Sequence, residues 1–195
     1  MINYRSIANA IDYYEKHCFA RVETPWLVSK PVSDITKPEG ALDYMVDSKN
    51  KVLVASGEQG FLYQYKKGFL PKGRFQTVTP CFRDETFDST HCKYFMKLEL
   101  IDTYSPTLSS LDEIVGAAKS FFYSRLEGLP YSSFDPDLLE VVATSEESYD
   151  ILYPDVEGTK VELGSYGIRT TSYLSWVYGT GIAEPRLSQL MEGYR

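Results

Sequence analysis

The chain has 195 residues, of which 43% are hydrophobic, and its formal net charge is −7. This length suits one hydrophobic core, so we expect a single domain over residues 1–195. The acidic charge argues against a broad nucleic-acid surface, which needs clustered Lys and Arg. No apolar run approaches the roughly 18 residues of a membrane span, and the N-terminus lacks the pattern of a signal peptide, so we expect a cytoplasmic protein.

The first half of the chain predicts two helices and two strands. Apolar residues recur at helical spacing over residues 7–18, which indicates an amphipathic helix. Alternation over residues 19–23 and the apolar run Val52–Ala55 predict strands. Ser56 is placed to cap a second helix over residues 58–67.

The second half predicts more strands, with helices between and after them. Two apolar strands joined by a polar loop are expected in residues 80–100, and a capping box at Ser110–Glu113 predicts a long helix. Strands are predicted at Leu138–Ala143 and Thr159–Leu163. Gly179–Gly181 predicts a turn that leads into a C-terminal helix with a proline in its first turn. Short strands with separate helices favour an α+β fold, an antiparallel sheet flanked by helices.

The loop between the strands in residues 80–100 carries side chains suited to a nucleotide. Arg83, Glu85 and Phe95 are expected on one sheet face, because alternate strand residues share a face. Arginine can donate two hydrogen bonds to a phosphate, glutamate can accept from an amine, and a ring can stack on a base. By itself the segment also fits a surface hairpin with an incidental Arg and Glu. It resembles motif 2 of the class II aminoacyl-tRNA synthetases, most closely the aspartyl branch.

Other segments resemble the same family in the same order. The N-terminal helix, strand and proline are similar to motif 1, which implies a homodimer through these elements. Residues 38–41 and 56–59 resemble stretches that precede motif 2 in the aspartyl branch, and residues 179–191 resemble motif 3, with its arginine at Arg186. Residues 161–169 are similar to a run in aspartyl-tRNA synthetases and in bacterial asparagine synthetase A. The resemblance implies the catalytic-domain fold of class II synthetases.

The resemblance implies a binding site for ATP. Arg83 would neutralise the α-phosphate and Glu85 would hold the adenine edge. Phe95 and Arg186 would sandwich the base, and Arg186 would also lie near the γ-phosphate. His91 would meet the terminal phosphates, or it is an exposed loop histidine.

The resemblance also implies a metal and an amino-acid site. Asp155 and Glu162 would hold Mg²⁺, which binds one or two carboxylates together with phosphates and water. Arg169 would face an acidic side chain, with Gln59 and Gly164 as further substrate-binding residues. The ordinary alternatives are a turn role for Asp155 and a surface charge for Arg169.

These assignments lead to three hypotheses. The first is an AMP-forming ligase that activates an amino acid, with aspartate as the first expectation, and passes it to a non-tRNA acceptor such as ammonia, another small molecule or a protein. The second is an aminoacyl-tRNA synthetase core that acts with a partner. We expect no anticodon-binding domain, which makes charging of tRNA the less favoured outcome. The third is a non-catalytic paralogue that binds a ligand and regulates a partner.

Overall fold

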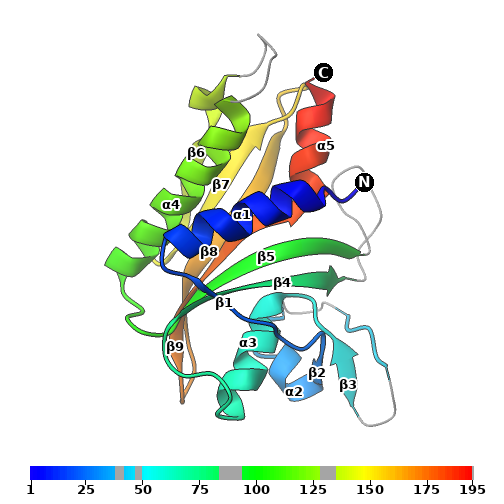
Figure 1. The fold of residues 1–195 in the computed structure, drawn as a ribbon, viewed down its shortest axis with the longest axis vertical. Coiled ribbons are helices and arrows are strands. Elements are labelled where there is room, and N and C mark those ends of the chain that lie inside the picture. Colours follow the sequence, from blue (N-terminus) through cyan, green and yellow to red (C-terminus); the bar gives the residue numbers. More distant parts are fainter. Residues whose placement is uncertain (38–41, 47–49, 84–93, 128–134, 195) are drawn as a thin grey trace.

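The computed structural model describes residues 1–37, 42–46, 50–83, 94–127 and 135–194, and it has the expected α+β fold (Figure 1). A seven-stranded sheet has the order β1-β4-β5-β9-β8-β7-β6, and all its neighbouring strands are antiparallel except β1 and β4. Its strands are β1 (Ala20–Arg21), β4 (Arg74–Phe82), β5 (Tyr94–Asp102), β6 (Glu140–Ser145), β7 (Ser148–Pro154), β8 (Lys160–Thr170) and β9 (Ser175–Glu184). A separate hairpin pairs β2 (Leu27–Ser29) with β3 (Lys51–Leu53). The helices are α1 (Tyr4–Lys16), α2 (Lys30–Ser33), α3 (Gly57–Lys66), α4 (Leu108–Glu127) and α5 (Arg186–Gly193), with a 3₁₀ turn at Pro136–Leu138.

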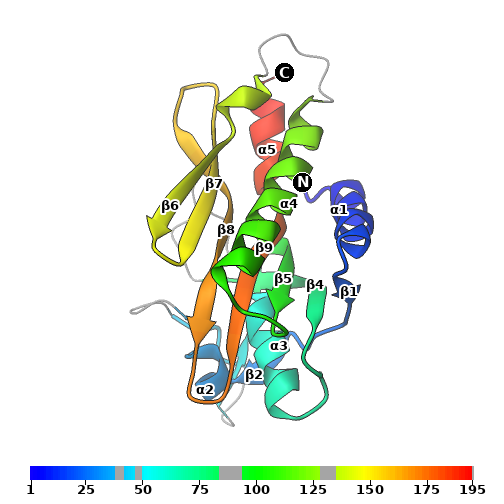
Figure 2. The same ribbon diagram turned by 90° about the vertical axis from the view of Figure 1, so that its left-hand side faces the viewer.

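One face of the sheet carries α1 and α4, which cross it as Figures 1 and 2 show, together with α5. Leu98 and Leu100 of β5 point to this side and join Phe121 and Phe122 of α4 in the larger core. The aromatic and aliphatic area buried here is the main stabilising contribution to the fold. No helix in the described ranges is long and apolar enough to cross a membrane.

The opposite face is covered over part of its area by α2, α3 and the β2–β3 hairpin. Trp176 of β9, Ile101 of β5 and Phe61 of α3 are buried in the smaller core on this side. Since strand residues alternate between faces, Phe95, Lys97 and Glu99 of β5 lie on the same face as Ile101. The second core therefore fixes α3 beside a row of polar side chains.

The predicted turn at Gly179–Gly181 is wrong, because both glycines lie inside β9. A β-bulge separates Leu98 and Glu99 in the ladder with β9. A Cβ at Gly181 would overlap Leu98 and would lie 2.8 Å from Cε2 of Tyr14. The hydroxyl of Tyr14 also donates a hydrogen bond to the carbonyl of Gly181 at 3.1 Å. The glycine therefore allows close approach of α1, and it does not reverse the chain.

Several other elements differ from the sequence prediction. The helix α4 begins at Leu108, before the predicted capping box, and the Thr107 hydroxyl accepts from the amide of Ser110 at 3.3 Å. The strand β7 was not predicted, and β8 extends seven residues beyond the predicted Leu163. Cys18 lies after α1 and is exposed, with φ of 65°.

Candidate active site

The ends of β4 and β5 bring Arg83 and Phe95 together on the exposed sheet face. Cys81 pairs with Phe95 in the ladder, and Arg83 lies two residues after Cys81 on the same side. The guanidinium carbon of Arg83 lies 5.2 Å from the centre of the Phe95 ring, a cation–π distance, and its Nε donates to the carbonyl of Ala55 at 3.4 Å. The cation and the aromatic ring therefore lie in contact with each other on this face of the sheet.

Two other predicted nucleotide contacts, Glu85 and His91, lie outside the described residues, as does the segment 38–41. Their assigned roles remain predictions.

Further along β5, an ion pair between Lys97 and Glu99 lies on the same sheet face as Phe95, and this face forms the floor of the site. Lys97 Nζ lies 2.7 Å from Glu99 Oε1, and the Ser56 hydroxyl donates to the same oxygen at 2.6 Å. The backbone N–H of Glu58 donates to Glu99 Oε2 at 3.1 Å. Burial raises the pKa of the Glu99 carboxyl, but Lys97 and these hydrogen bonds lower it by more, so that its net pKa lies below the ordinary value. Glu99 is therefore a carboxylate held in its ionised form at the N-terminus of α3.

A second ion pair, with a buried carboxylate, joins α3 to β8, and a hydrogen bond from Trp176 adds β9. Arg169 Nη1 lies 2.9 Å from Glu58 Oε2, and the indole Nε1–H of Trp176 donates to Glu58 Oε1 at 2.6 Å. The guanidinium carbon of Arg169 lies 4.3 Å from the centre of the Tyr178 ring. Burial raises the pKa of the Glu58 carboxyl, Arg169 lowers it and Glu99 raises it, with a net upward shift. Arg169 is therefore a partly exposed cation that is paired with a buried carboxylate.

Gln59 does not point into this site. Its Nε2 donates to the carbonyl and hydroxyl oxygens of Ser33, at 3.2 and 3.1 Å, and its Oε1 accepts from the amide of Ala55 at 2.9 Å. These bonds satisfy the side-chain amide within the protein and fix α3 against α2. The substrate role of Gln59 stays a prediction, and its neighbour Glu58 is the side chain of α3 that contacts Arg169.

Gly164 is likewise a packing position. A Cβ there would overlap the hydroxyl of Tyr166 and lie 3.1 Å from Cβ of Thr180. The Tyr166 hydroxyl needs this space, because it donates to the carbonyl of Thr180 at 2.6 Å. The approach of a buried tyrosine therefore explains the glycine, and the substrate contact of Gly164 stays a prediction.

Arg186 is the first residue of α5, which begins just after the end of β9. The ladder pairs Met96 with Glu184, which places the start of β5 beside the end of β9. Arg186 follows two residues later, and its Nη1 donates to the carbonyl of Glu162 at 2.9 Å and to Glu162 Oε1 at 3.3 Å. Two predicted site residues, Arg186 and Glu162, are thus in direct contact.

Asp155 forms the turn between β7 and β8. Its Oδ1 accepts from the backbone N–H groups of Glu157 and Thr159, at 2.9 and 2.8 Å. This is the turn role that the sequence left open. The side chain also lines a hollow of about 450 Å³ with Arg186, at the end of the sheet.

Asp150 is the carboxylate that the fold brings near Glu162. It lies opposite Ser165 in the β7–β8 ladder, where a bulge lies between Ile151 and Leu152. Burial raises its pKa most, the Ser165 hydroxyl lowers it and the charge of Glu162 raises it further. Both Asp150 and Glu162 are acids of neighbouring strands, and their charges interact.

The sequence did not single out Glu58, Lys97, Glu99, Asp150 or Trp176. Lys97 and Glu99 were accessible to sequence reasoning, because they continue the two-residue spacing that starts at Phe95. Asp150 and Trp176 depend on strand pairings that no local pattern reveals.

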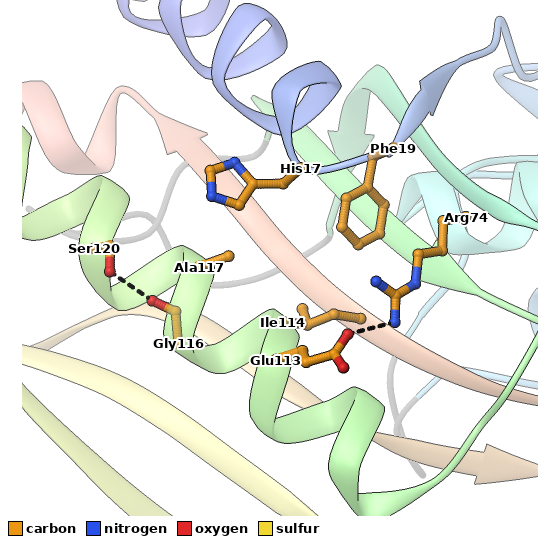
Figure 3. Close-up of a pocket in the computed structure, with 8 residues that line it drawn as sticks. All are labelled: His17, Phe19, Arg74, Glu113, Ile114, Gly116, Ala117 and Ser120. Carbon is orange, nitrogen blue, oxygen red and sulfur yellow. Dashed lines mark hydrogen bonds and ion pairs between the residues drawn. The ribbon is translucent and has the colours of Figure 1, made fainter.

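A second hollow, of about 330 Å³, lies where α1 ends against α4 (Figure 3). Arg74 lines this hollow, and two carboxylates bind its guanidinium group. Asp102 lies 2.7 Å from Nε and Glu113 lies 2.7 Å from Nη2. His17 stacks on Tyr13 with ring centres 4.2 Å apart. These contacts are packing and ion pairs, so the candidate active site is on the other face.

An antiparallel sheet flanked by helices, with the Arg83–Phe95 pair and Arg186 at one edge, is the catalytic-domain fold of class II aminoacyl-tRNA synthetases. A cytoplasmic serine-tRNA ligase from Naegleria fowleri in complex with AMP has the same fold, with a TM-score of 0.71, 19% identity and coverage of 97% of this chain and 48% of that one. The seryl-tRNA synthetase from Pyrococcus horikoshii complexed with ATP gives a TM-score of 0.72 at 18% identity, covering 95% of this chain and 49% of the other.

The family model described as tRNA synthetases class II (D, K and N) matches residues 1–125, and the chain belongs to this family. An aspartate–tRNA ligase from Ruminiclostridium cellulolyticum is 28% identical over 132 residues, which are 65% of this chain. The chain spans 21% of that relative and about half of each solved structure.

Proposed function

We propose that the chain binds ATP and activates an amino acid as an acyl-adenylate. The observation that carries the proposal is the Arg83–Phe95 pair at 5.2 Å, at the edge of a face floored by buried ion pairs. The family membership of residues 1–125 supports a ligase of this type. The complexes of the two seryl enzymes with AMP and ATP support nucleotide binding on this fold.

In the proposed reaction, a carboxylate oxygen of the amino acid attacks the α-phosphorus of ATP. A new P–O bond forms, the bond from the α-phosphorus to the bridging oxygen breaks, and pyrophosphate leaves. The nucleophile is already ionised, so catalysis needs positioning and charge neutralisation, without a general base. Arg83 would donate to the α-phosphate, and Phe95 and Arg186 would hold the adenine between them.

Asp150 and Glu162 fit a magnesium ion that arrives with the nucleotide. In the described ranges, no group of three or more His, Cys, Asp or Glu side chains is arranged to hold a metal ion. Two interacting carboxylates suffice for Mg²⁺ when phosphate and water oxygens supply the remaining ligands. When bound, the ion would neutralise charge on the phosphates. We propose Asp150 in place of Asp155, because the Asp155 carboxylate already accepts two turn hydrogen bonds.

For the acceptor, we propose a small molecule or a protein. The formal charge of −7 supports this choice, because tRNA binding depends on clustered cations. Incubation with ATP and a labelled amino acid tests it. Transfer of label to bulk tRNA would contradict this part of the proposal and leave the activation step intact.

ATP–pyrophosphate exchange across the twenty amino acids tests activation itself. At least one amino acid should support exchange, and Arg83→Gln should reduce kcat/KM for ATP about tenfold or more, the effect of losing one charged hydrogen bond to phosphate. Arg5→Gln, the same substitution at an exposed position of α1, is the control and should leave exchange unchanged. If calorimetry showed ATP binding while no amino acid gave exchange, a binding role without catalysis would replace the proposal.

A further inference from the structure

We infer that Glu58 excludes acidic amino acids from the site, so that the substrate side chain carries no negative charge. This inference rests on the proposed function and departs from the sequence expectation of aspartate. It concerns the one arginine that the resemblance assigns to an acidic side chain, Arg169. In the structure this arginine already binds a carboxylate of the protein itself.

The Glu58 carboxylate is held firmly in place. Its Oε2 lies 2.9 Å from Arg169 Nη1, its Oε1 accepts from Trp176 Nε1 at 2.6 Å, and its side chain is only 7% exposed. Its backbone N–H is bound to Glu99. Both oxygens have a partner and the backbone is fixed, so a substrate cannot displace this side chain without leaving a buried carboxylate unpaired.

Arg169 is also fixed, and its remaining surface is restricted. The guanidinium lies over the Tyr178 ring, and 34% of the Arg169 side chain is exposed. A substrate carboxylate at the exposed edge would be attracted to Arg169 and repelled by Glu58, which is bonded to the same guanidinium. Because the ion pair is neutral as a unit, Glu58 offsets part of the attraction that an unpaired arginine would give. An uncharged acceptor, such as a hydroxyl or a carboxamide oxygen, meets the same N–H groups without that repulsion.

The neighbouring ion pair does not supply the missing positive charge. Lys97 is 14% exposed and is bound to Glu99, which is 6% exposed. The charges of these two ion pairs therefore sum to zero, which favours an uncharged side chain over an acidic one beside them. Glu58 acts through Arg169, as a positioning residue that sets specificity.

The test measures the selectivity of ATP–pyrophosphate exchange in the wild type, in Glu58→Gln and in Glu15→Gln, an exposed position of α1 that serves as the matched control. The wild type should use its best uncharged amino acid at least tenfold better than aspartate or glutamate. Glu58→Gln should raise the ratio of kcat/KM for aspartate to that for the best uncharged amino acid at least tenfold. Glu15→Gln should leave this ratio unchanged. A merely structural role for Glu58 would lower all values together and leave the ratio where it was.

Two results would overturn the inference and leave the proposed function standing. One is a preference of the wild type for an acidic amino acid. The other is an unchanged ratio of kcat/KM values in a folded Glu58→Gln protein. If Glu58→Gln does not fold, the wild-type selectivity alone decides. If no amino acid supports exchange, the proposed function fails, and calorimetry with two sulfamoyl analogues of the adenylate, seryl and aspartyl, decides the inference. Tighter binding of the seryl analogue supports it, whereas tighter binding of the aspartyl analogue, or binding of neither, overturns it.

Discussion

The close approach of α3 to the sheet depends on Gly57, and Gly57→Ala tests it. A Cβ at this position would lie 2.8 Å from Glu99 Oε2, 2.9 Å from Thr77 Cγ2 and 2.9 Å from Thr79 Oγ1. All three neighbours are buried and belong to the sheet, so the helix has to move away from the floor. Overpacking of this kind costs about 1–3 kcal/mol, which exceeds the small gain in helix propensity at a first turn. We expect the free energy of unfolding to fall by roughly that amount.

Gly116→Ala is the matched control, since Gly116 lies within α4 and an added Cβ would meet no atom within 4 Å. Without a clash, alanine in place of glycine inside a helix stabilises by about 0.5–1 kcal/mol. Urea unfolding followed by circular dichroism measures both variants against the wild type. Equal stabilities of Gly57→Ala and Gly116→Ala would refute the packing of α3 against Glu99.

Three further outcomes are expected. Phe95→Leu should raise KM for ATP about tenfold, because stacking on a base contributes about 1–3 kcal/mol. Phe95→Tyr keeps an aromatic ring and should leave KM nearly unchanged. Equal effects of the two variants would argue against stacking. Asp150→Asn should raise the Mg²⁺ concentration for half-maximal exchange about tenfold, and Asp155→Asn should leave it unchanged. A raised Mg²⁺ requirement in Asp155→Asn alone would identify Asp155 as the ligand. The pKa of Glu99 in the folded protein lies below its ordinary 4.5, because Lys97 and hydrogen bonds outweigh burial. The ionised carboxylate therefore stabilises the fold above pH 4.5, and this stabilisation is lost as the pH falls through the lowered pKa. Urea unfolding as a function of pH should therefore show a flatter acid limb for Glu99→Gln, and an unchanged limb would contradict this.

The sequence predicted that Arg83 and Phe95 share a face of the sheet because only local rules were needed. Two strands joined by one loop lie side by side, and alternate residues share a face, so the side-chain types at the loop ends define what they present. The glycines of β9 were misjudged for the opposite reason. Gly181 is required by Tyr14, which lies 167 residues earlier in the chain, and a short-range pattern of glycines cannot distinguish a turn from a close approach.

Small differences in register decide which side chains meet, and the sequence does not show them. Adjacent residues of a helix point about 100° apart, so Gln59 bonds to Ser33 of α2 while Glu58 bonds to Arg169 of β8. In the β7–β8 hairpin, a bulge lies between Ile151 and Leu152, and Leu152 pairs with Glu162. Asp150, two residues before Leu152, therefore lies on the same face as Glu162, which spacing along the chain could not reveal.

The two ion pairs on the floor of the site are more readily explained by ligand binding than by stability. Burying charges costs several kcal/mol per ion, and well-packed apolar residues of similar volume are often as stable or more stable. Glu58 and Glu99 are nevertheless both buried, and the backbone of the first bonds the carboxylate of the second. Trp176, Ser56 and the two cations satisfy the remaining oxygens, so the cost is offset and not avoided. The two ion pairs hold their four charges in fixed positions and sum to zero, so they can hydrogen-bond a neutral polar side chain without attracting an acidic one, whereas an apolar floor offers no such hydrogen bonds.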